Sequence, residues 1–221
     1  MVLRSRNLWL LPVVLTIISF SSNTAKANAQ TTYIFNASYD AVGTSNFDPS
    51  NPTAPEQVIF NGSSTNAPYG LTEFNALRYS QFDQTTGSFI ITSDPTIIGL
   101  EDVSDGYIIL GGSNGNQLVG TYSGSGRVDF QNNTTTESGT FTITGGEGIF
   151  TGATGTLSAE AFNILPTEFQ APPNTFISQR SFSGSFQTPQ PVPESTSVAA
   201  LVGIGVGASF LLNQRHRKSA S

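Results

Sequence analysis

The chain contains no cysteine, and its single histidine, His216, lies among the last ten residues. Without cysteine, neither disulfide bonds nor thiol catalysis are possible. Upstream of His216 there is no histidine to act as an acid or base, to complete a serine–histidine–aspartate triad or to bind a metal. These absences exclude the side chains that enzymes most often use for catalysis. We therefore expect a non-enzymatic protein that needs no cofactor.

Charge is also scarce, because charged residues make up 11% of the chain, against about a quarter in typical proteins. Residues 30–194 hold all fifteen acidic residues against three arginines, which gives a net charge of −12. Such an acidic segment argues against nucleic acid as a partner. We expect the three arginines, Arg78, Arg127 and Arg180, to form structural ion pairs, with anion binding as the alternative.

The N-terminal segment, residues 1–29, has the three parts of a secretory signal peptide. Arginines precede an apolar run over residues 8–20. Small residues then form a cleavage pattern, Ala27-Asn28-Ala29, with Ala25-Lys26-Ala27 as a second candidate. We therefore expect export and cleavage by signal peptidase.

The C-terminal segment combines a polar motif, an apolar run and a basic end. The motif is Val192-Pro193-Glu194-Ser195, and the apolar run covers residues 197–212. The tail, residues 213–221, carries three basic side chains with long stems: Arg215, Arg217 and Lys218. The sixteen residues of this run rise about 24 Å as a helix, a little less than the roughly 30 Å hydrocarbon core. We expect a short transmembrane helix with a cytoplasmic basic tail.

This arrangement over roughly the last thirty residues resembles the PEP-CTERM sorting signal of exported bacterial proteins. The resemblance implies processing by an exosortase-type membrane enzyme. The sorting and processing positions would be Val192, Pro193, Glu194, Arg215, Arg217 and Lys218. It also implies a location in the membrane and then at the cell surface or outside the cell, with extracellular polysaccharide as a partner.

Between these ends, residues 30–188 read as one all-β domain, and residues 189–196 as a Pro-rich linker that holds the sorting motif. Apolar and polar residues alternate with the period of a half-buried strand. Strands are predicted over 33–39, 71–82, 88–92, 107–110, 117–122, 127–130, 140–144, 155–162 and 181–186. Loops are predicted over 43–55 and 166–174. The pattern predicts a single antiparallel β-barrel of about eight strands, with a sandwich as the alternative.

The most distinctive internal stretch is residues 141–157, FTITGGEGIFTGATGTL. Its glycines, which include Gly145, Gly146, Gly148 and Gly152, predict a tight corner with positive φ at several positions. The stretch resembles a hairpin of the allene oxide cyclase and dirigent barrels. That resemblance implies an eight-stranded antiparallel barrel whose central cavity holds a reactive apolar substrate. The functional side chains of those families lie outside this hairpin, and none can be mapped onto this chain.

Two further patterns involve carboxylates. Glu101, Asp102 and Asp105 precede Gly106, and carboxylates at a glycine turn can bind Ca²⁺. The spacing departs from that of a calcium loop, so an exposed acidic turn is the favoured interpretation. A pair of acids could also hydrolyse glycosides, but the pattern does not single out a pair.

We therefore expect an exported, non-enzymatic protein of the cell surface or extracellular matrix. The alternative is a barrel that binds or isomerises a small apolar molecule, since sixteen phenylalanines are available to line a cavity. A calcium or glycan binder is a third possibility. A packed interior would favour the first function, and an open pocket of about 300 Å³ or more would favour the second.

Overall fold

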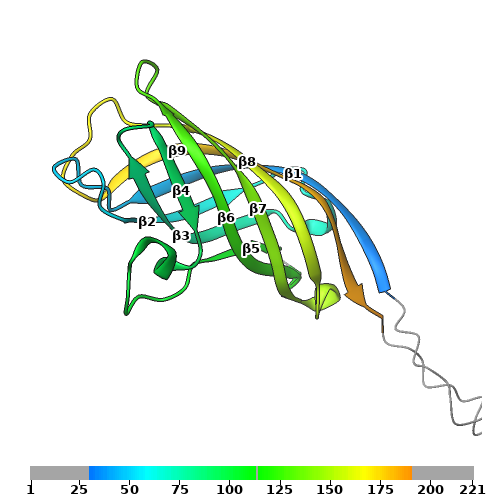
Figure 1. The fold of residues 1–221 in the computed structure, drawn as a ribbon. Coiled ribbons are helices and arrows are strands. Elements are labelled where there is room, and N and C mark those ends of the chain that lie inside the picture. The colour runs from blue at the N-terminus through cyan, green and yellow to red at the C-terminus, as the bar shows by residue number, and fades with distance from the viewer. Residues whose placement is uncertain (1–29, 113, 191–221) are drawn as a thin grey trace, which may run out of the picture. The chain divides into compact units, whose positions relative to one another are not determined.

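The computed structural model describes residues 30–112 and 114–190, which form one compact unit over Gln30–Pro189. Figure 1 shows the fold, which is all-β as predicted and has no α-helix in the described residues. The strands are β1 (Gln30–Ser45), β2 (Glu56–Ser63), β3 (Glu73–Asp83), β4 (Ser88–Thr92), β5 (Tyr107–Gly111), β6 (Gln117–Asp129), β7 (Thr134–Glu147), β8 (Thr154–Ile164) and β9 (Asn174–Pro189). Three short 3₁₀ helices join them: η1 (Pro68–Gly70), η2 (Pro95–Ile98) and η3 (Gly148–Phe150).

All nine strands belong to one antiparallel sheet that closes into a ring. Their order is β2-β1-β9-β8-β7-β6-β4-β3-β5, and β2 also pairs with β3. β4 and β5 lie end to end between β3 and β6, because β4 pairs with the second half of β3 and β5 with the first half. Nine strands therefore fill eight positions. The sheet is continuous, so the predicted alternative of two packed sheets does not form.

Residues 93–106 leave the sheet between β4 and β5. The Gly106 N–H donates to the Ser93 carbonyl over 2.7 Å, so the excursion begins and ends at the same place. It contains η2, whose Ile98 is buried, and a carbonyl that accepts a hydrogen bond from the Tyr79 hydroxyl over 2.7 Å. The excursion thus covers part of β3, and Tyr79 is buried beneath it.

The ring interior changes from aromatic to polar along its length. After Thr188, the buried side chains of β9 follow one another toward its start as Phe186, Phe182, Arg180, Ser178 and Asn174. Near the end of β9, Tyr33 stacks on Phe186 with ring centroids 5.1 Å apart, and Phe150 meets Phe186 edge-on at 5.3 Å. The domain's own aromatic side chains therefore fill this half of the interior.

Several strands differ from their predicted extents. β2 was not predicted, because only Val58 and Phe60 are buried within it. β6 joins two predicted segments, and Phe130, predicted to lie in a strand, follows its last residue. β1 continues to Ser45, three residues into the predicted loop, because it pairs with β9 along its whole length.

The glycine corner forms as predicted between β7 and β8. Gly148 and Gly152 have φ values of 64° and 74°, in the left-handed region that favours glycine. η3 begins at Gly148 and places Phe150 in the interior, where it is fully buried. The corner therefore contributes an aromatic ring to the filled end of the sheet.

Gly139 and Gly145 offer a matched test of the packing along β7. A Cβ atom on Gly139 would lie 2.5 Å from the Ser123 carbonyl oxygen and 2.6 Å from the Tyr122 hydroxyl, whereas one on Gly145 meets nothing within 4 Å. We expect Gly139→Ala to lower the free energy of unfolding by about 1–3 kcal/mol. Gly145→Ala should change it by less than about 0.5 kcal/mol. Urea titrations would measure both, and equal effects would contradict this account.

Candidate functional site

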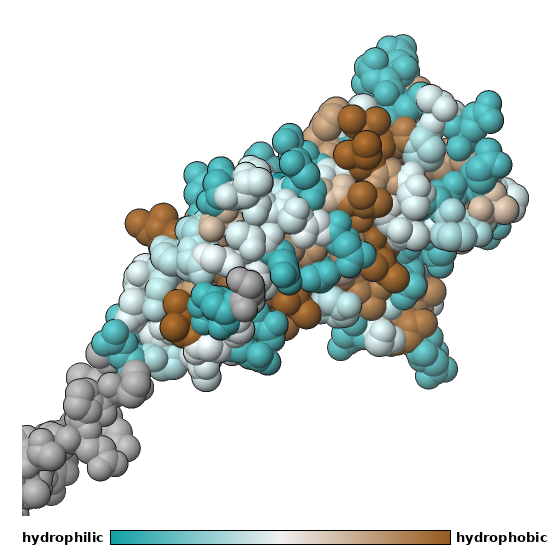
Figure 2. Space-filling model, turned by 180° about the vertical axis from the view of Figure 1, so that it is seen from behind, coloured by the Kyte–Doolittle hydropathy of each residue, from teal (hydrophilic) through white to brown (hydrophobic). Residues whose placement is uncertain are grey.

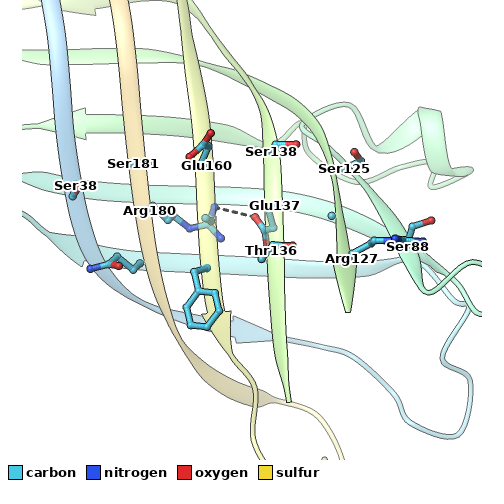
Figure 3. A pocket seen from close by; sticks show the side chains of 14 residues that line it. Ser38, Ser88, Ser125, Arg127, Thr136, Glu137, Ser138, Glu160, Arg180 and Ser181 are labelled. Atoms are coloured by element: carbon cyan, nitrogen blue, oxygen red, sulfur yellow. Dashed lines mark hydrogen bonds and ion pairs between the residues drawn. The ribbon is translucent and has the colours of Figure 1, made fainter. Parts of the chain in front are cut away.

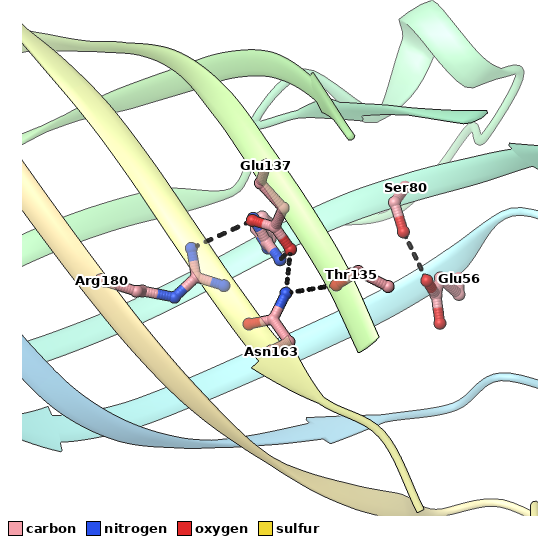
Figure 4. A network of polar contacts seen from close by, with 7 residues as sticks. Glu56, Ser80, Thr135, Glu137, Asn163 and Arg180 are labelled. Atoms are coloured by element: carbon pink, nitrogen blue, oxygen red, sulfur yellow. Dashed lines mark hydrogen bonds and ion pairs between the residues drawn. The ribbon is translucent and has the colours of Figure 1, made fainter. Parts of the chain in front are cut away.

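A buried ion cluster crosses the interior of the ring (Figure 4). Arg78 of β3 donates to Glu137 of β7 through both terminal nitrogens, with Nη1–Oε2 at 2.5 Å and Nη2–Oε1 at 2.7 Å. Arg180 of β9 adds a contact of 3.3 Å from Nη1 to Oε2. The three side chains are at most 5% exposed. In the described sheet β3 and β7 are not neighbours, so the cluster connects separate walls of the ring.

Phe60 and Asn163 complete the surroundings of the cluster. The Arg180 and Arg78 guanidinium carbons lie 3.9 Å and 4.5 Å from the Phe60 ring centroid, which is within cation–π range. Asn163 Nδ2 donates to Thr135 Oγ1 and to Glu137 Oε1, both over 2.7 Å. Both oxygens of Glu137 therefore accept hydrogen bonds, as a buried carboxylate requires.

The environment holds all three groups in their charged forms. Burial acts to raise the pKa of Glu137, but the positive charges of Arg78 and Arg180 outweigh it and bring this pKa to about 2. Burial, reinforced by the like charge of Arg78, lowers the pKa of Arg180 to about 10. At neutral pH the cluster thus carries one net positive charge. A carboxyl group with a pKa near 2 is poorly matched to acid–base catalysis at neutral pH.

A cavity of about 140 Å³ reaches this cluster from the polar half of the interior. Arg78, Glu137 and Asn163 form part of its lining, and Glu56, which accepts hydrogen bonds from the Ser45 and Ser80 hydroxyls, forms another part. Six phenylalanines also line it: Phe47, Phe82, Phe89, Phe130, Phe169 and Phe176. The Asn163 Oδ1 atom is buried and has no hydrogen-bond partner among the described residues. The cavity is mostly apolar, with one unused acceptor.

A larger and more open groove, about 910 Å³, lies on the outer face of the sheet (Figure 3). One row of its lining crosses five strands from β1 to β6, with each residue paired to the next: Ser38, Ser181, Glu160, Ser138 and Ser125. The adjacent row supplies Gln179, Phe162, Thr136 and Arg127. Short polar side chains and one exposed aromatic ring therefore make up most of this groove.

An apolar band, formed by Val42, Ile177 and Ile164, borders the groove. The three are direct cross-strand neighbours on β1, β9 and β8, and each is at least 50% exposed. Apolar side chains also gather between polar ones on the side of the molecule shown in Figure 2. Phe162 is two residues from Ile164 on the same face of β8, so its ring lies where the apolar band meets the polar groove.

The structure shows some of the residues singled out from the sequence, while others lie outside the part that it describes. The sorting residues Val192, Pro193, Glu194, Arg215, Arg217 and Lys218, and the cleavage residues Ala27 and Ala29, lie outside the described residues. Arg78 and Arg180 form buried ion pairs as predicted, while Arg127 is exposed in the groove. The acidic turn with Glu101, Asp102 and Asp105 is exposed. Within the described residues, no three acidic or histidine side chains are placed to hold a metal ion.

Glu137 and Asn163 were not predicted as site residues, although the sequence contains a signal for both. Glu137 lies four and six residues before Phe141 and Ile143, and therefore shares their buried face of β7. Asn163 shares the buried face of β8 with Leu157 in the same way. A charged or amide residue in the apolar phase of a strand needs a buried partner. The alternation along one strand is enough to identify such a buried polar residue. The residue that pairs with it can be found only when the order of the strands in the sheet is known.

The chain has no match among known proteins in any of three comparisons. No protein-family model, no curated protein and no solved structure matches it. The function is therefore inferred from the chain and its geometry.

Glu137 provides a test of the ion cluster. Glu137→Gln should lower the free energy of unfolding at pH 7 by about 3–5 kcal/mol, because it leaves two buried guanidinium groups without a countercharge. Folding lowers the pKa of Glu137 from 4.5 to about 2. Its contribution is therefore complete above pH 4.5 and is lost as the pH falls toward 2. Over that range the variant should lose less stability than the native protein.

The matched control is Glu160→Gln, since Glu160 is exposed on the neighbouring strand β8. This change should alter the free energy of unfolding by less than about 0.5 kcal/mol. Denaturant titrations at pH 7 and pH 3 would measure all three proteins. A Glu137→Gln protein as stable as the control at pH 7 would refute the structural role of the cluster.

Proposed function

We propose that the chain is an exported, non-enzymatic protein of the cell surface or extracellular matrix. In this proposal residues 1–29 are a signal peptide and residues 30–188 a β-barrel domain. Residues 189–196 form a linker with the sorting motif, residues 197–212 a membrane helix and residues 213–221 a cytoplasmic tail. The observation that carries the proposal is the interior filled by aromatic side chains. The cavity beside the ion cluster measures about 140 Å³, less than the 300 Å³ or more typical of small-ligand sites.

The charge state of the interior supports the absence of catalysis. Glu137 lines the cavity, but its pKa is about 2 and both its oxygens are hydrogen-bonded. Proton transfer at neutral pH favours a group whose pKa lies near 7. The outer groove, in contrast, exposes hydroxyl and amide groups that can bind an extended partner without a reaction. The interior cavity and the outer groove are therefore both better suited to binding a partner than to catalysing its reaction.

The two ends of the chain support export and sorting. The cleavage pattern at Ala27 and Ala29 is that of signal peptidase substrates. The resemblance to PEP-CTERM signals supports processing near Pro193 and Glu194 by an exosortase-type enzyme, after retention by the apolar run over residues 197–212. The protein would then pass from the membrane to the cell surface or the extracellular material.

Mass spectrometry of the protein recovered from producing cells tests this fate. We expect a mature N-terminus after Ala29 or Ala27, and released protein that ends near Pro193-Glu194. Glu194→Ala should leave the protein unprocessed in the membrane fraction, while Glu168→Ala, in the exposed loop before β9, should be processed normally. Intact Lys218 in released extracellular protein would refute the processing step.

A second candidate function, the binding of a small apolar molecule in the interior, is favoured by one specific observation. Six phenylalanines contribute to the lining of the cavity, and the buried acceptor Asn163 Oδ1 has no donor among the described residues. A dry apolar cavity of about 150 Å³ can hold benzene. The geometry here suits a ring of that size that carries one hydroxyl group, which would donate to Asn163.

Thermal unfolding of the full chain with phenol or benzene would test this candidate. Phenol should raise the melting temperature in proportion to its binding, and more than benzene does, because only phenol can donate to Asn163. Leu165→Trp, at the partly exposed lining of the cavity, should abolish the effect by filling the space. Equal melting temperatures with and without phenol would eliminate this candidate.

A further inference from the structure

We propose that the outer groove across β1, β9, β8, β7 and β6 binds a neutral polysaccharide chain. The inference rests on the proposed function in one respect, namely that the domain meets such polymers outside the cell. It goes further by assigning the binding surface and the charge of the partner. Three features of the outer face carry it: its hydroxyl groups, the distribution of charge, and the shape around Phe162.

Hydroxyl and amide side chains dominate the outward positions of these five strands. Strand pairing aligns them in rows that run from β1 to β6. One such row is Asn36, Ser183, Ser158, Thr140 and Ser123, and the next is Ser38, Ser181, Glu160, Ser138 and Ser125. All are exposed except Ser181, which is half-buried. Neighbouring strands lie about 4.8 Å apart, so donors and acceptors recur at close intervals across the sheet.

The charge on this face contrasts with that of the whole domain. The two rows hold one charged residue, Glu160. Asp48, Glu101, Asp102, Asp105 and Glu168 lie outside the strands, and Asp83 is the last residue of β3. On the outer face itself, the exposed Asp40 of β1 pairs with Gln179 in the adjacent row. In a segment of net charge −12, an anionic polymer would be repelled at low ionic strength. A neutral partner would meet hydroxyl groups and avoid most of this repulsion.

The groove is long and open, which suits a polymer better than an enclosed small molecule. The hollow of about 910 Å³ adjoins a second of about 520 Å³, and both are lined by Arg127, Thr136 and Phe162. The second hollow extends the groove to Asp129, the last residue of β6, and to Asn132 beyond it. A chain that follows both hollows would cross the strands and pass Phe162.

Phe162 supplies an apolar surface at the point where the two hollows meet. Its side chain is 44% exposed, so a ring face or edge is open to contact. A pyranose presents C–H groups on its faces and hydroxyl groups at its rim. The C–H face would pack on Phe162, while the rim hydroxyls exchange hydrogen bonds with Thr136, Ser138 and Glu160. Arg127 offers further donors at the same place.

Binding of the full chain to polysaccharides tests the inference. We expect retention on insoluble cellulose and retarded migration in gels that contain a soluble neutral glucan, with little retardation by the anionic polymer alginate. Phe162→Ala should weaken binding to the neutral glucan by about five-fold. Ser138→Lys, which puts a long charged side chain in the middle of the groove, should weaken it by at least as much.

The matched control is Tyr107→Ala, an exposed aromatic residue on β5 that lines neither the groove nor the cavity. It should bind within about two-fold of the native protein, and thermal unfolding should show that all variants are folded. Equal binding by Phe162→Ala and Tyr107→Ala, no binding to any neutral glucan, or stronger binding to alginate would each overturn the inference. A processed extracellular protein that fails this test would refute the site but leave the proposed function intact. Glucan binding by a chain that is never exported would support the site but refute the proposed function.

Discussion

The paired hydrogen bonds between Arg78 and Glu137 are the contact on which the rest of the interior depends. They join β3 to β7 across the ring, between residues 59 positions apart in the chain. Planar guanidinium and carboxylate groups fit together in few ways, so the contact sets the spacing of the two walls. Aromatic rings fill the interior on one side of it and the cavity lies on the other. The desolvation of three charges is offset only while all three remain together.

The ion cluster and the outer groove depend on the same strand register. Arg180 points inward between Gln179 and Ser181, and Glu137 points inward between Thr136 and Ser138, all four of which line the groove. Successive side chains of a strand point to opposite faces, so a shift by one residue would exchange the two sets. Such a shift would expose the charges and bury the hydroxyls. Because this exchange would be unfavourable in free energy, the strand register that aligns the hydroxyl rows is stable.

Alternation along single strands made much of the fold predictable. The pattern around Phe141, Phe182 and Tyr33 indicated half-buried strands, and the glycines at 145–155 indicated the corner before β8. β2 was missed because its buried residues, Val58 and Phe60, are too few to establish a period. The sequence could not predict which residues meet in the ion cluster or line the groove, since each is assembled from strands whose order around the ring is a tertiary property. The same holds for β4 and β5, which share one position because residues 93–106 leave the sheet between them.

The pairing of the first and last strands also has a mechanical consequence. Gln30 pairs with Pro189, and the two strands remain paired as far as Ser45 and Asn174. β9 is bonded on its other side to β8, from Gln187 to Ile177. A force applied to the chain after Pro189 and resisted by a partner on the outer face would pull β9 along its own axis. The hydrogen bonds on both sides would then share the load in shear rather than open one after another. A strand held in this way suits a domain that must stay folded under tension.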